Sequence, residues 1–351
     1  MATDNRAPVP AVADAATGGR AVAAGSLRAR LLSWDVAIVL ITVVVILWAS
    51  ATVENFASGQ NAVFLTLDLA PLLMIALPMT LIVVTGEIDL SVASTVGLSG
   101  AVMGWLWNQG MSIETIVPLC ILLGAALGAL NGLFVTGFGL PSLAVTIGTL
   151  TLFRGLATVV LGDEAVVDWP YQYTSWVTGT IGGTSIPNVA IPLAVAAVAF
   201  GVVLHATPVG RSLFAMGANE QAARFGGTRV RAVKFWLYVV CGAVAALVGV
   251  YWTLRYSSAR GNNAVGLELA VVASVLLGGV SIFGGRGTLW GVVAGALLLV
   301  SLQNALRLED VSDDALQVVT GLLLIVSVLL PNVASGLRDA WSRHRRTPAP
   351  H

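Results

Sequence analysis

The chain has 351 residues, of which 57% are hydrophobic and only 10% are charged, and its mean hydropathy is +0.88. Soluble domains carry about 25% charged residues on average, so this composition excludes an ordinary water-soluble enzyme. Eighteen Lys and Arg residues balance eighteen Asp and Glu residues. With no net positive charge to attract phosphate backbones, we expect no nucleic-acid partner.

The chain divides into three parts by composition. Residues 1–33 are rich in Ala, Gly, Pro and Arg and lack a long apolar run, which predicts a disordered cytoplasmic tail rather than a cleaved signal peptide. Residues 34–335 predict one transmembrane domain. Residues 336–351 are basic and predict a cytoplasmic C-terminal tail.

Ten apolar runs have about the length needed to cross a bilayer as a helix. The fold class is therefore predicted as all-α, a polytopic membrane protein of about ten transmembrane helices. The eighth and ninth runs are short and flanked by glycine, so they are either complete spans or broken, re-entrant ones. The ten runs are Val36–Thr52, Phe64–Val84, Val92–Trp107, Ile113–Val135, Ser142–Leu161, Val189–His205, Val233–Thr253, Leu267–Phe283, Leu289–Asn304 and Ala315–Leu330.

The positions of the cations predict the orientation of these helices. With the N-terminus inside, fourteen Lys and Arg residues fall in inner segments and three in outer segments. Because cytoplasmic loops carry an excess of Lys and Arg, we expect a bacterial inner-membrane protein with both termini in the cytoplasm.

The long outer loop, residues 162–188, combines aromatic side chains with carboxylates. Two interpretations have equal weight: a docking surface for a soluble partner, or an aromatic belt at the membrane interface. The aromatic residues are Trp169, Tyr171, Tyr173 and Trp176.

Glycines and prolines inside the apolar runs predict local packing. Gly124, Gly128 and Gly132 recur every four residues, a pattern that lets two helix backbones approach closely. Pro71 and Pro78 fall inside the second run, where they should kink the helix and free backbone carbonyls.

The sequence contains no catalytic constellation and no metal-ligand cluster. Its two cysteines, Cys120 and Cys241, lie in apolar runs and are expected to be buried hydrophobic residues rather than disulfide partners. A phosphate-binding G-x-x-x-x-G-K-[ST] loop is also missing. If ATP drives this protein, a separate chain must hydrolyse it.

Polar residues at membrane depth are candidates for a substrate pathway, although each has a structural interpretation of at least equal weight. Hydroxyl and amide groups outnumber charge pairs among them, which suits a neutral polyhydroxylated ligand better than an ion. Asp89 could also cap the helix that follows it. The candidates are Asp89, Asn131, Thr146, Arg154 and Glu268.

The inner loop over residues 206–232 contains the segment Gly217–Gly227. Its pattern predicts a short amphipathic helix with Asn219 near its start and glycine at its end. A rigid cytoplasmic helix between two spans can transmit the movement of a partner, whereas the alternative is a solvated linker.

Four ordered motifs together resemble a known family. They resemble the permease subunits of ATP-binding-cassette (ABC) importers for monosaccharides, the ribose/xylose/arabinose-type family that includes rhamnose and autoinducer-2 systems, over about residues 36–335. Glu87 and Ala93 stand where that family most often has glycine, which favours the rhamnose or autoinducer-2 subgroup. The motifs are Gly86–Ser94, Asn131-Gly132 with Pro141–Thr149, Gly217–Gly227 and Glu268–Gly287.

The resemblance implies a non-catalytic pore subunit in the lipid bilayer. It would pair with a second permease, identical or similar, and receive a sugar from an extracytoplasmic binding protein. Cytoplasmic ATPase subunits would use ATP and Mg²⁺, and this chain would bind no cofactor. The resemblance also implies ATPase-coupling residues in the inner loop: Gly217, Asn219, Glu220, Ala222, Ala223 and Gly227.

Two alternatives remain from the residues themselves. An ABC permease for branched-chain amino acids would need sites for a carboxylate and an ammonium group, and Arg154 is the one cation within a span. A secondary carrier would transport without any ATPase and would have no use for the inner-loop helix. A membrane enzyme is the least favoured because no nucleophile–base pair is present.

Overall fold

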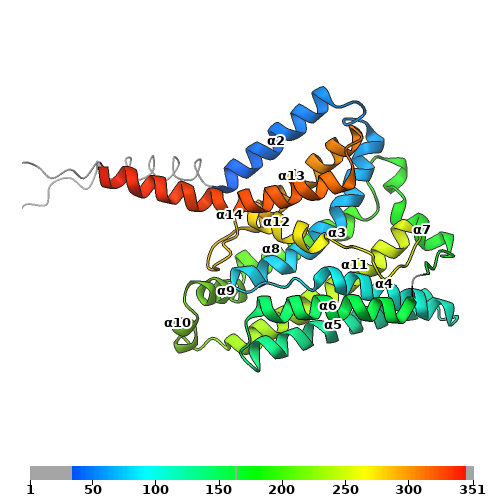
Figure 1. Ribbon diagram of the computed structural model, residues 1–351, viewed down its shortest axis with the longest axis horizontal. Helices are drawn as coiled ribbons and strands as arrows, with labels where there is room; N and C mark the ends of the chain where they lie inside the picture. The colour runs from blue at the N-terminus through cyan, green and yellow to red at the C-terminus, as the bar shows by residue number, and fades with distance from the viewer. Residues whose placement is uncertain (1–33, 163, 345–351) are drawn as a thin grey trace, which may run out of the picture.

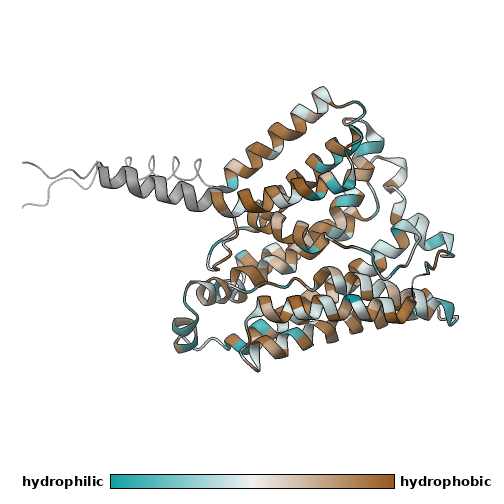
Figure 2. Cartoon of the chain, viewed as in Figure 1, coloured by the Kyte–Doolittle hydropathy of each residue, from teal (hydrophilic) through white to brown (hydrophobic). Residues whose placement is uncertain are grey.

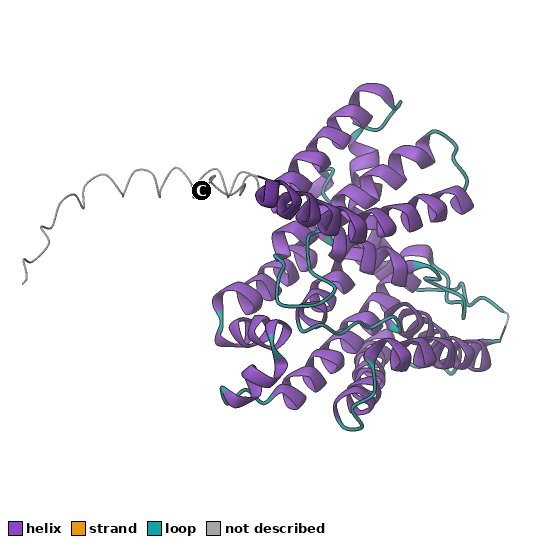
Figure 3. Ribbon diagram, turned by 60° about the vertical axis from the view of Figure 1, so that its left-hand side comes forward, coloured by secondary structure: helices purple, strands orange, loops and turns teal. Residues whose placement is uncertain are grey.

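The structure, a computed structural model, describes residues 34–162 and 164–344. Within these residues the chain forms helices joined by loops, with no strand (Figure 3). The tail predicted over residues 1–33, Asp163 and the end of the predicted C-terminal tail, residues 345–351, lie outside the described part.

Each predicted apolar run contains one helix, and these helices follow the runs in order. The first six are α2 (Trp34–Thr52), α3 (Gly59–Val84), α4 (Val92–Asn108), α5 (Ile113–Thr136), α6 (Ser142–Leu161) and α8 (Ala190–Ala206). The last four are α11 (Val230–Tyr256), α12 (Leu267–Leu277), α13 (Leu289–Leu308) and α14 (Asp313–His344). The loops contribute α7 (Tyr171–Thr178), the short 3₁₀ helix η1 (Ile181–Gly183), α9 (Pro208–Ala218) and α10 (Glu220–Phe225).

An all-helical polytopic membrane protein is confirmed. Among the described residues, six helices are long and apolar enough to cross a membrane, and α8 with α9, bent by 66° at their junction, make up to seven. Figure 2 shows hydrophobic residues along the long helices and hydrophilic residues in α10 and at several helix ends and loops. The figure of about ten spans stays a prediction.

The eighth and ninth apolar runs have different structures. Helix α12 ends at Leu277, so the predicted run to Phe283 is a short helix followed by a glycine-rich loop. Gly279, Gly284 and Gly285 in this loop have φ angles between +74° and +84°, which only glycine adopts readily. Helix α13, by contrast, is a complete 20-residue helix, begun by Thr288, whose hydroxyl accepts from the Gly291 N–H.

Helix α11 packs against α3, α4 and α5 (Figure 1). The predicted glycine ridge on α5 forms this contact. A Cβ atom on Gly124 would collide with the backbone of Gly242, and one on Gly128 with the backbone of Tyr238. The close approach of two helix backbones is thus confirmed, and bulkier residues would separate them.

Helix α3 continues through both of its prolines. Pro71 cannot donate to the carbonyl of Leu67, four residues earlier, and that carbonyl instead accepts a hydrogen bond of 2.8 Å from the Tyr251 hydroxyl of α11. The freed carbonyl predicted from the sequence is therefore satisfied by a neighbouring helix. The two cysteines are buried and unpaired, as predicted.

The outer loop divides its aromatic residues between two environments. Trp169 is buried and stacks on Trp107 with ring centroids 5.7 Å apart. Tyr171 and Trp176 of α7 are exposed. Docking surface and interface belt both stay predictions for the exposed pair.

Candidate functional site

The predicted inner-loop helix is present as α10, Glu220–Phe225. The Asn219 side chain accepts a 3.0 Å hydrogen bond from the N–H of Ala222, which caps the helix start as the sequence predicts. Gly227, with φ of +87°, follows the helix end. Gly217 lies outside this helix, near the end of α9, and α10 is shorter than the whole motif.

The motif also exposes an aromatic side chain that was not among the candidates from the sequence. Phe225, the last residue of α10, is 93% exposed, whereas Ala223 two residues earlier is buried against the protein. An apolar ring held in water at the end of a capped helix is suited to insertion into a partner. The exposed face of α10 is therefore a candidate docking surface.

A buried lysine ties α10 to the membrane helices. Lys234 of α11 is the only lysine in the sequence, and its side chain is 8% exposed. Its Nζ atom lies 2.7 Å from Oε2 of Glu220 and 2.6 Å from Oε1 of Glu87, which stands in the turn between α3 and α4. Glu220 also pairs with Arg224. The hydrogen bond from Lys234 lowers the pKa of the Glu220 carboxyl below its ordinary value.

Backbone contacts also join the ends of these helices, in addition to the ion pairs of Lys234. The N–H of Gly285 donates a 2.8 Å hydrogen bond to the carbonyl of Val84, the last residue of α3. A Cβ atom on Gly217 would collide with that same carbonyl and with the backbone of Gly285. The end of α9, the end of α3 and the glycine-rich loop after α12 therefore touch through their backbones.

Three of the predicted polar residues gather around the turn that holds Glu87. The N–H and hydroxyl of Ser91 donate to Oδ1 of Asp89 at 2.9 and 2.7 Å, and Nδ2 of Asn131 donates to the Ser91 hydroxyl at 2.7 Å. Thr146 of α6 donates to the carbonyl of Ile88 at 3.5 Å. Asp89 therefore holds Ser91, the residue before α4, instead of binding the first N–H groups of that helix.

The other two predicted residues lie apart from this group. Nη1 of Arg154 donates to the carbonyls of Gly261 and Asn263 at 3.2 and 2.6 Å, in the loop that follows α11. Glu268 lies in the first turn of α12, and its Oε2 atom is buried without a hydrogen-bond partner. Arg154 therefore anchors the loop after α11.

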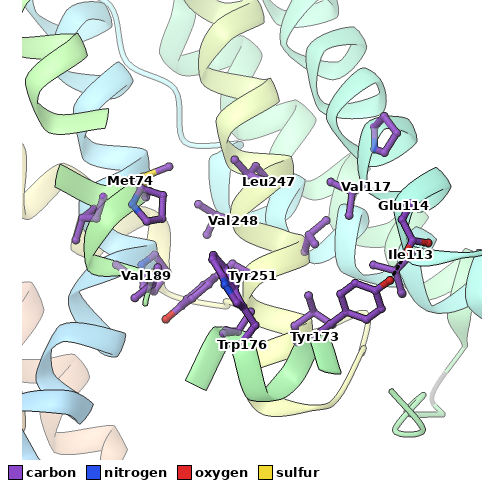
Figure 4. Close-up of a pocket in the computed structure, with 18 residues that line it drawn as sticks. Met74, Ile113, Glu114, Val117, Tyr173, Trp176, Val189, Leu247, Val248 and Tyr251 are labelled. Carbon is purple, nitrogen blue, oxygen red and sulfur yellow. Dashed lines mark hydrogen bonds between the residues drawn. The ribbon is translucent and has the colours of Figure 1, made fainter. Parts of the chain in front are cut away.

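A large cavity of about 500 Å³ lies between α3, α5, α7, α8 and α11. Its walls are almost wholly apolar, with Met74, Val117 and Leu247 around it and α7 closing one side (Figure 4). Both of its tyrosine hydroxyls are already bonded, Tyr251 to a carbonyl of α3 and Tyr173 to Glu114. A polyhydroxylated solute would lose its hydrogen bonds to water there, so this cavity is not a site for one.

Comparison with known proteins agrees with the resemblance found in the motifs. Residues 61–328 match the family described as branched-chain amino acid transport system / permease component. The chain is 31% identical to the ribose import permease protein RbsC of Haemophilus influenzae over 281 residues, which cover 79% of this chain and 87% of that protein.

Two further relatives extend the match over most of the chain. It is 32% identical to the L-arabinose ABC transporter permease protein AraH of Azospirillum brasilense, over 89% of this chain and 93% of that one. It is 29% identical to the autoinducer 2 import system permease protein LsrD of an Enterobacter species, over 90% and 99%. No solved structure matches the chain.

Proposed function

This chain belongs to the permease family described as branched-chain amino acid transport system / permease component, and we propose that it forms the membrane pore of an ABC importer for a monosaccharide or a similar polyhydroxylated solute. The match to permeases named for ribose, L-arabinose and autoinducer 2, along 79–90% of the chain, is the observation that carries this proposal.

A branched-chain amino acid is the less favoured cargo, although the family description names that class. Such a solute needs a fixed positive group for its carboxylate. Arg154, the candidate cation from the sequence, already donates to two backbone carbonyls. Arg255 and Arg307 already share the carboxylate of Asp68. Recruiting any of them for a ligand would break these contacts.

The proposed complex contains three kinds of partner. A second permease, identical or similar to this one, completes the pore, and an extracytoplasmic binding protein delivers the solute. A cytoplasmic ATPase, which uses ATP and Mg²⁺, docks on the exposed face of α10 around Phe225. This chain then needs no cofactor and no catalytic residue of its own, and both of its termini lie in the cytoplasm.

The contacts around Lys234 supply a route for movement. A push on α10 displaces Glu220, and Lys234 passes the displacement to Glu87 because its ammonium group binds both carboxylates within 2.7 Å. Glu87 belongs to the same turn as Asp89 and Ser91, which precede α4. The Ser91 hydroxyl donates to Asp89 and accepts from Asn131 of α5. ATPase movement thus reaches the ends of three membrane helices.

The test is solute uptake into liposomes that contain the permease with its ATPase and binding protein. Uptake of one or more aldopentoses or 6-deoxyhexoses that requires ATP supports the proposal. Phe225→Ala should lower both uptake and the affinity for the ATPase about tenfold or more, as expected for a buried aromatic anchor. Tyr171→Ala, which alters an 83% exposed aromatic on α7, is the matched control and should leave the affinity for the ATPase unchanged.

Two results would overturn the proposal. Uptake that continues without ATPase or nucleotide identifies a secondary carrier. ATP-dependent uptake of leucine or valine, with no uptake of sugars, identifies an amino-acid permease.

A further inference from the structure

A second cavity, of about 660 Å³, lies at the other end of α11, between that helix, α3 and α13. In the predicted orientation it faces the outer side of the membrane. Its volume falls in the usual range of small-molecule sites, about 300–1,000 Å³. Unlike the first cavity, it combines an apolar lining with charged and amide side chains, among them Gln60, Asp68, Arg255 and Arg307.

An ion cluster forms one wall of this cavity. Arg255 of α11 pairs with Oδ1 of Asp68 on α3, and Arg307 of α13 lies 3.7 Å from Oδ2 of the same carboxylate. The Arg255 side chain is only 8% exposed and its guanidinium also lies 4.9 Å from the centre of the Tyr256 ring. Three helices therefore converge on a single carboxylate.

The cluster retains unused hydrogen-bonding capacity. Nη1 of Arg255 is buried and has no hydrogen-bond partner, which is a costly arrangement for a charged donor. Arg307 is half exposed and holds its two carboxylate partners only at 3.4 and 3.7 Å. By contrast, Asn61 and Asn304 bind each other at 2.8 and 3.0 Å and brace α3 against α13.

We propose that this cavity binds a neutral polyhydroxylated solute on the outer side of the permease. Asp68 accepts hydrogen bonds from solute hydroxyls, and Arg255 and Arg307 donate to them. Gln60, which is exposed at the cavity, can do both. This inference rests on the proposed import function, because it places a receiving site for the cargo where the binding protein would release it.

The surrounding charges favour a neutral ligand over an acidic side chain of a docking protein. Asp68 already offsets one of the two guanidinium groups, and Asp313 lies 3.4 Å from Arg307. Glu309 and Asp310 follow directly after α13 and are exposed. An incoming carboxylate would meet these like charges, whereas the hydroxyl groups of a sugar would not.

The test is sugar binding to the permease–ATPase complex in lipid nanodiscs without the binding protein. Binding is measured by saturation-transfer NMR. The probes are D-ribose, L-arabinose and any sugar transported in liposomes. Arg307→Gln should weaken binding about tenfold, the effect of one charge-assisted hydrogen bond. Arg260→Gln removes the same charge from an exposed position in the loop after α11 and should leave binding unchanged.

The outcomes separate this site from the proposed function. ATP-driven sugar uptake without sugar binding to the complex, or equal binding in the two variants, overturns the site and leaves the importer intact. Ribose binding that is lost in Arg307→Gln supports the site even if the liposomes import no sugar, a result that would overturn the importer. If Arg307→Gln instead weakens only the affinity for the binding protein, the cavity is a protein-docking surface and the proposal is wrong.

Discussion

Helix α11 carries a buried cation near each end, and the two cations have opposite surroundings. Lys234, near the start, faces two carboxylates, Glu87 and Glu220. Arg255, near the end, shares the single carboxylate of Asp68 with a second guanidinium, that of Arg307. Arg224 on Glu220 and Asp313 on Arg307 add one further partner to each cluster. At the buried cation itself, carboxylates outnumber cations in the first cluster and guanidinium groups outnumber carboxylates in the second.

This difference in balance indicates different tasks. The ammonium group of Lys234 binds two carboxylates from separate elements, α10 and the turn after α3, so it can transmit force between them. The group around Arg255 borders a cavity and includes the half-exposed Arg307, so it can receive a ligand. Helix α11 thus links the force-transmitting cluster at Lys234 to the solute cavity beside Arg255.

The largest expected effect comes from removing Lys234 from its cluster with Glu87 and Glu220. Lys234→Met leaves the Glu87 and Glu220 carboxylates without their shared cation, and removing one partner of a buried ion pair costs about 3 kcal/mol. We expect the free energy of unfolding in detergent to fall by about that amount and ATP-driven uptake to be lost. Lys234→Arg, which keeps the charge, should retain most of both. Unchanged uptake in Lys234→Met would show that this connection transmits nothing.

The next effect comes from disturbing the contact between α5 and α11, which lies between the two ends of α11. Gly128→Leu places a side chain against the backbone of Tyr238 and forces α5 away from α11, and overpacking of this kind costs about 1–3 kcal/mol. Gly148→Leu on α6, where no atom lies within 4 Å of an added Cβ, is the matched control. Differential scanning fluorimetry should show a lower Tm only for the first variant. Equal Tm values would mean that the α5–α11 contact does not rigidify the helix.

A smaller effect on stability is expected in the cluster of Asp68, Arg255 and Arg307. Asp68→Asn removes the charged acceptor of Arg255, and a hydrogen bond to a charged group contributes about 1.5 kcal/mol. The free energy of unfolding should fall by that amount, while basal ATP hydrolysis by the complex stays unchanged. Glu309→Gln, an exposed carboxylate nearby, should alter neither quantity. A loss of basal ATP hydrolysis in Asp68→Asn would contradict the division of tasks between the two ends.

The smallest effect is a pH dependence of the stability contributed by the Lys234–Glu220 pair. Because Lys234 lowers the pKa of Glu220 below its ordinary value of 4.5, this carboxylate stabilises the fold above pH 4.5 and loses that contribution as the pH falls through its lower folded pKa. Glu220 is partly exposed, so solvent screens the pair and the effect is small. The Tm difference between wild type and Glu220→Gln should be present at pH 7 and shrink below pH 4.5. A difference that grows on acidification would contradict this pairing.

Local patterns predicted much of the fold. The apolar runs fixed the positions of most long helices, since a backbone in lipid must satisfy its own hydrogen bonds within a helix. Asn219 predicted the start of α10 because an amide side chain caps a helix that begins next to it in sequence. The glycine ridge on α5 predicted a close helix contact, although not that α11 would make it.

The functional groupings could not be predicted in the same way. Glu87 and Lys234 are 147 residues apart, and Asp68 and Arg255 are 187 apart. Each is an isolated charge in the sequence, and Arg255 and Lys234 counted only as evidence of orientation. Of the five polar candidates, Asp89, Asn131 and Thr146 came together, whereas Arg154 and Glu268 did not.

The sequence by itself determined that this protein is a membrane-spanning helical bundle with a capped helix between two of its long helices, because hydropathy, glycine spacing and capping act between residues a few positions apart. Only the tertiary structure decided which charges meet. An ion pair within a membrane protein depends on which helix faces bring two side chains within about 4 Å, and that choice belongs to the packing of the whole bundle.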